Sequence, residues 1–300
     1  MKSSTIRIAG TSAAKALADS VAAGNGSSIL VMRNSLGQNY SRGVELSYAE
    51  LARILPPKTA YSLIPSNVFQ TTARDGAVST LALSECERML RSRDAMQHNH
   101  SIFVGGDHLT SMCTVLASLK VLGNDFKLLW LDAHADIHNE ETSPSRNKHG
   151  MVVNMLINHK YAGIPQLNPS QVLYVGLRST EPEEDAFIRK WKIRTITASD
   201  FLKNEMKCLR QIAHFTHGCN AHVSLDVDVM DPSELCATAT PAKNGLSLNQ
   251  VLRIMGVVES ESRHYYATDI MEYNPQKCTT TPQDAAISRE TMRAIFGFLV

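Results

Sequence analysis

Carboxylates and imidazoles are concentrated in three short segments, each directly after an apolar run of the chain. GGDH (105–108) follows SIFV, DAHAD (132–136) follows KLLWL, and DVD (226–228) follows HVSL. Like charges this close repel one another and raise their own pKa values, a cost that bound cations can offset. The segments therefore predict a site for two divalent cations. Its predicted ligands are His108, Asp132, His134, Asp136, Asp226 and Asp228.

The residue types indicate the kind of ion and the kind of chemistry. Side chains two apart on an extended segment face the same way, which would bring the ligands of each segment together. Oxygen-rich ligands with one imidazole per ion suit Mn²⁺, whereas a structural Zn²⁺ more often draws on Cys. Two such ions roughly 3.5–4 Å apart can share one water and convert it into a hydroxide nucleophile. The hypothesis is a hydrolase centre.

Each segment also has a plainer interpretation. Gly-Gly-Asp is common in turns, His108 alone could be a core histidine, and DVD alone also fits a strand end with an Asx turn. Together, at successive strand ends, the three segments indicate a metal site more strongly than any one of them.

The rest of the sequence predicts a scaffold that places strand ends side by side. Short apolar, β-rich runs alternate with stretches of helical spacing, a pattern typical of a parallel sheet covered on both faces. Right-handed crossovers then give one three-layer α/β/α domain with a mainly parallel central sheet. Binding sites in such sheets form beyond the carboxyl ends of the strands. The strand runs lie near residues 28, 102, 128, 173, 223 and 266, and helical spacing covers 76–96, 109–122, 182–191, 247–259 and 283–298.

Length, charge and cysteine usage exclude several classes of protein. With 300 residues the chain can bury a large core, and residues 27–300 are predicted to form one domain. A formal net charge of +1 without clustered basic residues leaves no electrostatic footprint for nucleic acid. No apolar run approaches the roughly 20 residues of a membrane span. The six cysteines show no CxxC pairing and are predicted to be reduced thiols, mostly buried.

Residues 1–26 differ in composition from the rest of the chain. They carry Lys2, Arg7 and Lys15, a single acid, Asp19, and many Ala and Ser, which is typical of a mitochondrial transit segment. An N-terminal arm and a genuine first strand at TIRIAG (5–10) are the alternatives. A transit segment predicts a mitochondrial protein, and the alternatives leave a cytoplasmic one.

Six motifs, in their order along the chain, resemble those of the arginase (ureohydrolase) family: GGDH, DAHAD, SRNKHG, GLRSTEPEE, SLDVDVMDP and DIMEYNP. The likeness runs from about Ser28 to the C-terminus, and NYSRGVEL (39–46) resembles the loop after the family's first strand. The resemblance implies an arginase-like fold with residues 1–26 as an extension. It also implies two Mn²⁺ ions per subunit, a homotrimer or homohexamer, and a guanidino substrate cleaved to urea and an amine by a metal-bridging hydroxide.

The roles of individual residues follow from the same resemblance. One ion would be held by His108, Asp132, Asp136 and Asp228, and the other by His134, Asp132, Asp226 and Asp228, with Asp132 and Asp228 shared. His149 matches the family's active-site histidine, which can pass a proton to the departing amine. Glu272 matches the glutamate that pairs with the guanidinium. Asp136 completes this catalytic set, and Thr240 matches a threonine close to the substrate.

Residues of the outer pocket favour L-arginine as the substrate, hydrolysed to L-ornithine and urea. Ser145 and Asn147 match the SxN that helps hold the substrate's α-carboxylate in arginases. Glu181 and Glu184 stand at the acidic positions of the loop that reads the α-amino group. Two departures bear on substrate choice: His138 replaces the family's usual Asn, and Glu181 is one methylene longer than the usual Asp.

The alternatives are another ureohydrolase (agmatinase, guanidinobutyrase or formimidoylglutamase) and a catalytically silent metal-binding homologue. The complete ligand set, together with His149 and Glu272, argues against the silent homologue. A binuclear phosphoesterase would require Arg or Lys to clamp phosphate, and no motif offers one beside DAHAD or DVD.

Overall fold

The structure is a computed structural model that describes residues 6–8, 28–37, 47–55, 59, 61–64, 78–94, 100–123, 125–158, 161, 163–278 and 281–300. At its centre these residues form a nine-stranded sheet in which every strand pair is parallel. The order across the sheet is β1-β3-β2-β4-β9-β8-β5-β6-β7. The strands are β1 (Ile6–Ile8), β2 (Ser28–Met32), β3 (Tyr61–Ile64), β4 (Ser101–Val104), β5 (Phe126–Leu131), β6 (Val172–Leu177), β7 (Arg194–Thr197), β8 (Asn220–Asp226) and β9 (His264–Met271).

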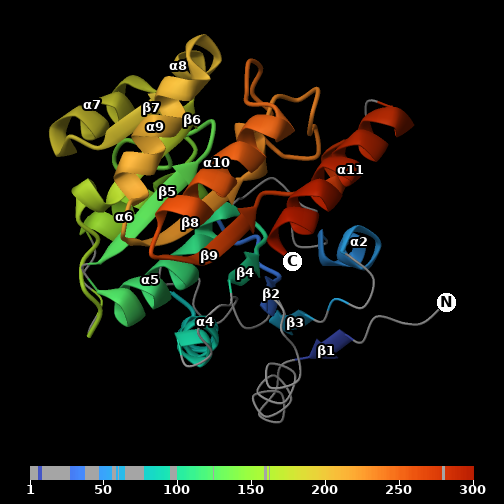
Figure 1. Ribbon diagram of the computed structural model, residues 1–300, viewed down its shortest axis with the longest axis horizontal. Coiled ribbons are helices and arrows are strands. Elements are labelled where there is room, and N and C mark those ends of the chain that lie inside the picture. The colour runs from blue at the N-terminus through green and yellow to red at the C-terminus, as the bar shows by residue number, and fades with distance from the viewer. Residues whose placement is uncertain are drawn as a thin grey trace.

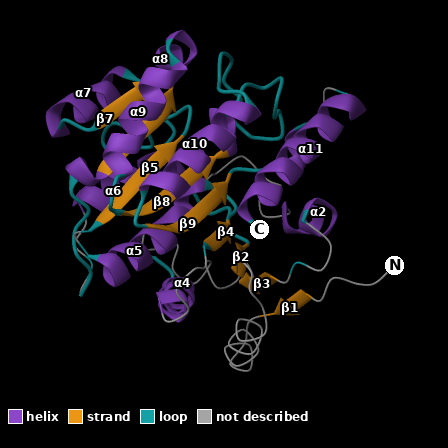
Figure 2. Ribbon diagram, viewed as in Figure 1, coloured by secondary structure: helices purple, strands orange, loops and turns teal. Residues whose placement is uncertain are grey.

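Helices cover both faces of the sheet and complete a three-layer arrangement (Figure 1). The helices are α2 (Ser47–Ile54), α4 (Thr80–Asp94), α5 (Ser111–Leu122), α6 (Val152–Asn158), α7 (Pro182–Trp191), α8 (Ala198–Lys203), α9 (Glu205–Thr216), α10 (Leu248–Glu261) and α11 (Pro282–Leu299). One face packs against α4 to α7, and the other against α2 and α8 to α11. Figure 2 shows these helices arranged around the sheet. Within the described ranges, no helix is long and apolar enough to cross a membrane.

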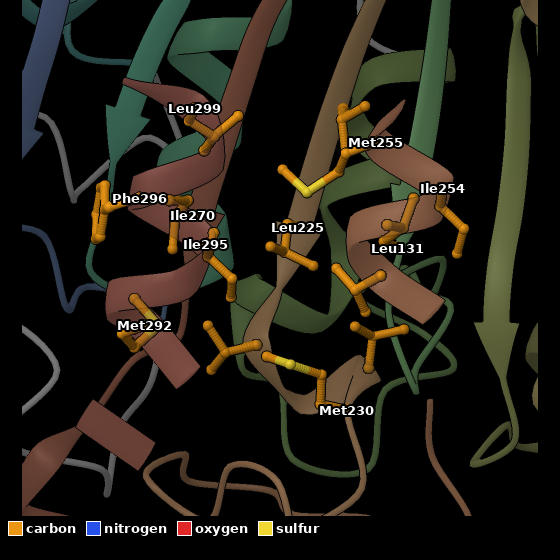
Figure 3. Packing of buried hydrophobic residues seen from close by; sticks show 14 of the residues in the cluster. Leu131, Leu225, Met230, Ile254, Met255, Ile270, Met292, Ile295, Phe296 and Leu299 are labelled. Atoms are coloured by element: carbon orange, nitrogen blue, oxygen red, sulfur yellow. The ribbon is translucent and has the colours of Figure 1, made fainter. Parts of the chain in front are cut away.

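The core follows the two-residue periodicity of the strands. On β5, Leu129 and Leu131 belong to the cluster under α10 and α11, whereas Leu128 and Trp130 belong to the cluster under α5 and α6. Figure 3 shows part of the first cluster, with side chains of α10 and α11 packed onto the sheet. Parallel strands are apolar on both faces because helices cover both faces. Each large aliphatic side chain buried in this way contributes about 1.5–3 kcal/mol.

Four neighbouring strands at the centre of the sheet lead into the predicted site segments. β4, β9, β8 and β5 are hydrogen-bonded neighbours in that order, and their carboxyl ends lie at one edge because they are parallel. GGDH follows β4, Glu272 follows β9, Asp226 ends β8, and Asp132 follows β5. Between β8 and β5 the order of the strands reverses, because β5 leads to β6 on one side and β8 leads to β9 on the other. Parallel α/β sheets form their binding sites at such points. The topology therefore brings the four segments together.

The sequence predicts the fold class and most of the central elements correctly. All six apolar runs form strands, and the five helical stretches overlap α4, α5, α7, α10 and α11, although α10 and α11 extend one or two residues beyond the predicted bounds. β3 and β7 were not predicted, because polar residues interrupt the apolar run in YSLI and RTIT. Ile6–Ile8, within TIRIAG, pair with β3 as the edge strand β1. The rest of residues 1–26, and NYSRGVEL, lie outside the described residues.

The prediction that all six cysteines are reduced thiols is wrong for one pair. Cys236 and Cys278 form a disulfide, with their Cα atoms 5.5 Å apart and a sequence separation of 42 residues. Cys236 follows β8 and Cys278 follows β9, so neighbouring strands bring their loops together. The two cysteines are brought together only by the tertiary fold, and their spacing in the sequence does not predict the pair. The free cysteines are Cys86, Cys113 and Cys208, which are buried, and Cys219, which is half-buried.

Candidate metal centre and active site

His108 lies at the deep end of the candidate site among three carboxylates. Its Nδ1 is 3.1 Å from Asp132 Oδ2, 3.1 Å from Asp136 Oδ2 and 3.3 Å from Asp226 Oδ2. All four side chains are buried, yet Nδ1 makes no hydrogen bond of acceptable geometry to any described residue. The nitrogen and the oxygens of Asp132 and Asp226 all lie within 4.8 Å of one another, as the ligands of one ion would. Ligands are arranged in this way around a cation.

A second group of potential ligands surrounds His134. Its Nδ1 lies 3.1 Å from Asp228 Oδ2 and 3.5 Å from Asp132 Oδ1. Asp132 therefore turns one oxygen toward each histidine, as a carboxylate shared by two ions would. The side chain of His134 is 28% exposed, whereas that of His108 is fully buried, so the site opens to solvent on the His134 side.

The structure divides the ligands differently from the sequence expectation. Asp226, rather than Asp228, lies with His108, and Asp228 lies with His134. The reason is that β8 ends at Asp226, and Val227–Val229 turn into a 3-10 helix whose first turn Asp226 caps by accepting from the Asp228 N–H at 2.8 Å. The two carboxylates are therefore not on one extended segment, and the two-residue rule does not apply to them.

Burial and mutual repulsion set the charges of this site before any cation binds. Burial, together with the carboxylates of Asp228 and Asp132, raises the pKa of Asp226 well above its usual value. Burial lowers the pKa of His134, but Asp228 and Asp132 outweigh this effect and raise it to about 12. Without cations the site therefore retains protons that metal binding would displace. Four carboxylates and two imidazoles, with no thiolate, fit two hard divalent ions.

Glu272 and His149 form a pair beside His108. Glu272 is 1% exposed, and its Oε1 accepts from the His108 backbone N–H at 2.9 Å and lies 3.1 Å from His149 Nδ1. The backbone of Glu272 has φ 63°, a left-handed conformation that costs about 1–3 kcal/mol and is concentrated at functional sites. Burial lowers the pKa of His149, but Glu272 outweighs it and raises the pKa to about 9. His149 therefore carries a proton at neutral pH.

The three outer-pocket residues with ionisable side chains lie together. His138 is buried, with its Nε2 3.4 Å from Glu181 Oε2 and 3.9 Å from Glu184 Oε1. Glu184 is also buried and accepts from the Glu181 N–H at 3.0 Å, in the first turn of α7, and burial raises its pKa. The side chain of Glu181 is half exposed. The carboxylate of Glu184 is thus hydrogen-bonded to the backbone, while that of Glu181 is accessible to solvent.

Thr240 touches a candidate ligand, whereas Ser145 and Asn147 bond to one another. Thr240 Oγ1 donates to Asp228 Oδ2 at 3.0 Å. The exposed Ser145 accepts from the Asn147 N–H through its Oγ at 3.2 Å, in the loop that leads to His149. This local bond shapes the SxN loop.

Trp130 and Asp107 contact the site but escape the sequence analysis. Trp130 stacks on His108, with ring centroids 4.0 Å apart and planes 10° apart, and its Nε1 donates to Asp132 Oδ2 at 3.0 Å. Asp107 is buried and accepts from the Gly37 N–H at 2.6 Å, which ties the loop after β2 to the loop after β4. Trp130 could have been found from its position two residues before Asp132, on the same face of the segment.

Arg178 is a further residue that the sequence analysis leaves out. Its guanidinium donates to the backbone carbonyls of Asp228 at 2.6 Å, Val229 at 3.2 Å and Met230 at 3.2 Å. It also donates to the carbonyls of Gly176, Ala242 and Lys243. One side chain thus holds the backbone around a candidate ligand, Asp228.

The protein has a parallel α/β sheet and two adjoining groups of potential His and Asp metal ligands at its central strand ends. It is therefore an α/β protein with a candidate binuclear metal site. Residues 66–297, more than half of the chain, match the Arginase family. The chain therefore belongs to the arginase family, as its motifs indicate.

Curated relatives agree with this assignment. The arginase of Neurospora crassa is 32% identical over 219 residues, which cover 66% of this chain and 60% of that protein. The arginase of Entamoeba histolytica is 29% identical over 233 residues, which cover 74% of this chain and 76% of that protein. The chain spans 47% of the arginase of Plasmodium falciparum.

Solved structures confirm the predicted arginase-like fold. The arginase of Bacillus cereus has a TM-score of 0.73 at 22% identity and covers 92% of this chain and 98% of its own. Entamoeba histolytica arginase in complex with L-ornithine has a TM-score of 0.69 at 24% identity, covering 91% and 98%. A hypothetical agmatinase from Burkholderia thailandensis has a TM-score of 0.64 at 17% identity, covering 92% and 86%.

Proposed function

We propose that this protein is a binuclear metal hydrolase that cleaves the guanidinium of L-arginine to L-ornithine and urea. Family membership and the arginases among its relatives support the proposal. The observation that carries it is the position of Asp132, whose two oxygens face two different histidines while the buried Glu272 lies beside one of them. That arrangement fits a shared pair of cations next to a carboxylate able to bind a guanidinium.

The ligand groups define where the cations would be held. One would be held by His108, Asp132, Asp136 and Asp226, and the other by His134, Asp132 and Asp228. When bound, two divalent cations supply a water acidic enough to act as a nucleophile near neutral pH. Thr240 would orient Asp228 through their hydrogen bond, as outer-shell partners do for metal-binding carboxylates.

Glu272 and His149 would act on the substrate. The carboxylate of Glu272 can meet two guanidinium N–H donors with its two oxygens and fix the central carbon for attack. In the metal-free chain burial lowers the pKa of His149, but Glu272 outweighs it and raises the pKa to about 9, which favours the protonated ring. Its proton can pass to the nitrogen that leaves as an amine when the C–N bond breaks. Addition of water to the guanidinium carbon precedes this cleavage and supplies the oxygen of urea, and the proton that this water loses restores the one that His149 gives up.

L-Arginine is the preferred substrate of this proposal because residues for both of its polar ends are present. Ser145 and Asn147 stand in the loop before His149, and the half-exposed Glu181 faces the outside from the loop before α7. Together they could hold an α-carboxylate and an α-ammonium group. A site built on such hydrogen bonds rejects analogues that lack one of the groups.

A guanidine without a carboxylate, such as agmatine, is the second candidate. The observation that favours it is that His138 Nε2 faces Glu181 and Glu184, where the family's Asn would offer an amide to a carboxylate. Acids on the outer side of the pocket attract a distal ammonium group and repel a carboxylate.

The proposal extends to the ion, the assembly and the compartment. The oxygen-rich ligand set supports Mn²⁺ as the ion. Arginase family membership supports a homotrimer or homohexamer. The pairing of Ile6–Ile8 with β3 supports the first-strand alternative over a transit segment, and with it a cytoplasmic protein.

Urea release from the Mn²⁺-loaded protein, measured in parallel on L-arginine, agmatine and guanidinobutyrate, tests this function. A preference for L-arginine supports the first candidate, and a preference for agmatine supports the second. The matched variant is His138→Asn, which restores the amide and should raise the L-arginine-to-agmatine ratio of kcat/KM. Two bound ions without urea from any substrate would contradict both candidates and favour a silent homologue.

A further inference from the structure

A buried polar network extends from His108 toward α5, away from the substrate side of the site. Apart from His108, its members come from α5, β8 and β9, and none is exposed. They are His108, Ser111, Thr114, Ser118, His222, Ser224 and Asp269. Polar groups at this depth are costly unless they bond to one another. Neither the fold nor the predicted ligand set explains why an apolar sheet should contain them.

The network begins at the ring nitrogen of His108 that faces away from the carboxylates. Nδ1 faces Asp132, Asp136 and Asp226, whereas Nε2 lies 3.0 Å from Ser224 Oγ. A histidine that binds a metal through Nδ1 is neutral and must carry its proton on Nε2. That N–H can only donate, so Ser224 Oγ must accept from it.

The hydrogen-bonding capacity of Ser224 then fixes the direction of its own proton. A hydroxyl has one proton to donate and two lone pairs to accept with. Ser224 Oγ lies 3.1 Å from Asp269 Oδ2 and 3.0 Å from Ser111 Oγ. The proton of Ser224 is donated to Asp269 Oδ2, which leaves its two lone pairs to accept from Ser111 and His108.

Asp269 is held firmly enough to impose this direction. Its Oδ2 also accepts from Thr114 Oγ1 at 2.9 Å, and its Oδ1 lies 2.9 Å from His222 Nε2, a contact too bent to count as a hydrogen bond. The other nitrogen of His222 lies 2.9 Å from Ser118 Oγ. In the sheet Asp269 pairs directly with Ser224, so the two backbones hold these side chains in register.

Trp130 and Ser224 constrain His108 in different ways. The stacked indole fixes the plane of the imidazole, but it contacts the ring face and cannot select which nitrogen carries the proton. The hydrogen bond to Ser224 does select it. We propose that Asp269, acting through Ser224, is a positioning residue that keeps the proton of His108 on Nε2 and presents Nδ1 to the metal. This inference rests on the proposed binuclear function.

The test compares Mn²⁺ binding by the metal-free wild-type chain and by Ser224→Ala and Asp269→Asn, measured by titration against a competing chelator. Ser224→Ala removes one oxygen and no carbon, so the packing of β8 is preserved. In both variants one of the two ions should bind about 10–100-fold more weakly, the usual effect of losing such a partner. The other ion, held by His134, should bind as before. The Mn²⁺ EPR spectrum at one equivalent should then be that of an isolated ion.

Ser118→Ala is the matched control, because it removes a buried hydroxyl from the same network without touching Ser224 or His108. It should change the affinity of either ion by less than about threefold. Unchanged binding of both ions in Ser224→Ala would overturn the proposal. Equal weakening of both ions, or an equal effect of Ser118→Ala, would also overturn it, because either result indicates a general loss of packing. A wild-type chain that binds no Mn²⁺ would overturn the proposed function, and this inference with it.

Discussion

The two halves of the candidate metal centre differ in how the surrounding structure holds them. The ring of His108 is fully buried, stacks on Trp130 and bonds to Ser224. The side chain of His134 is 28% exposed, and the contacts described for its ring are with Asp132 and Asp228. The core of the protein therefore holds one half, and the other is partly open to solvent.

This difference assigns a separate task to each half. The rigid half has Glu272 attached to it, because that carboxylate accepts from the His108 backbone N–H. The metal ligands and the predicted guanidinium partner are thus fixed relative to one another. Such preorganisation lets charged groups act without rearranging during the reaction. The open half, which contains His134, is held instead by hydrogen bonds from the Arg178 guanidinium to the backbone carbonyls around Asp228.

Asp132→Ala should affect both halves of the candidate metal centre, because this carboxylate faces both His108 and His134. We expect the loss of both ions and a decrease in urea release of more than about 100-fold, beyond the range for losing an outer-shell partner. Metal analysis and the urea assay measure the two effects. Asp136→Ala is the matched variant, because Asp136 contacts only His108 among the two histidines and should affect one ion. An Asp132→Ala chain with two tightly bound ions would refute the shared role.

Glu272→Gln should weaken the action on the substrate without changing metal binding in the half that contains His108. The amide keeps the size of the side chain but removes the charge that a guanidinium would pair with. We expect kcat/KM for the guanidino substrate to decrease about 10- to 100-fold, as expected for a lost charge-assisted hydrogen bond. Metal content should stay at the wild-type level. Unchanged steady-state kinetics would exclude Glu272 from guanidinium binding.

His149 gives a pH-dependent test on the metal-free protein. Its pKa is raised to about 9 in the folded chain from an ordinary value of about 6.5. The stabilisation is therefore complete below about pH 6.5 and is lost as the pH rises through about 9. Denaturant unfolding should show His149→Gln less stable than wild type by at most about 3 kcal/mol at pH 6, and by little at pH 10.

His217→Gln is the control for this experiment. Its ring lies at the same 3.1 Å from a glutamate, Glu261, but its side chain is 77% exposed. Exposed pairs contribute little, so its unfolding free energy should show no comparable dependence on pH. A constant difference between wild type and His149→Gln from pH 6 to pH 10 would contradict the pairing with Glu272.

Arg178→Lys should have the smallest effect, confined to the open half. Lysine keeps the charge but cannot reach carbonyls on several sides at once. We expect a loss of stability of about 1–2 kcal/mol, equivalent to one or two hydrogen bonds, and a weaker ion at His134. Thermal unfolding and Mn²⁺ titration measure the two effects. Arg263→Lys, at an exposed arginine, should change neither, and wild-type behaviour of Arg178→Lys would show that the clamp is dispensable.

The features that the sequence predicts are those encoded in short, continuous segments of the chain. Apolar runs predicted β4, β5, β8 and β9, and the polar residues directly after them predicted the strand ends. Parallel topology then requires those ends to meet, which explains why all six candidate ligands fall into two adjoining groups. This inference needs only the order of the segments in the chain.

The remaining features depend on contacts between distant segments or on turn geometry. The separation of Asp226 from Asp228 arises from a 3-10 turn that an extended-strand rule cannot foresee. The disulfide joins residues of two loops that only the pairing of β8 with β9 brings together. Asp269 is the exception, because an acid inside the apolar run YYATDIM signals a buried partner, and the sequence analysis did not use it.

The most direct test of the two-ion account is a titration of the metal-free protein with Mn²⁺ during continuous measurement of urea release from L-arginine. The account predicts two ions per chain, with urea release that continues to rise as the second ion binds and becomes constant at two equivalents. Full activity at one equivalent, or two bound ions that release no urea from any guanidino substrate, would contradict it.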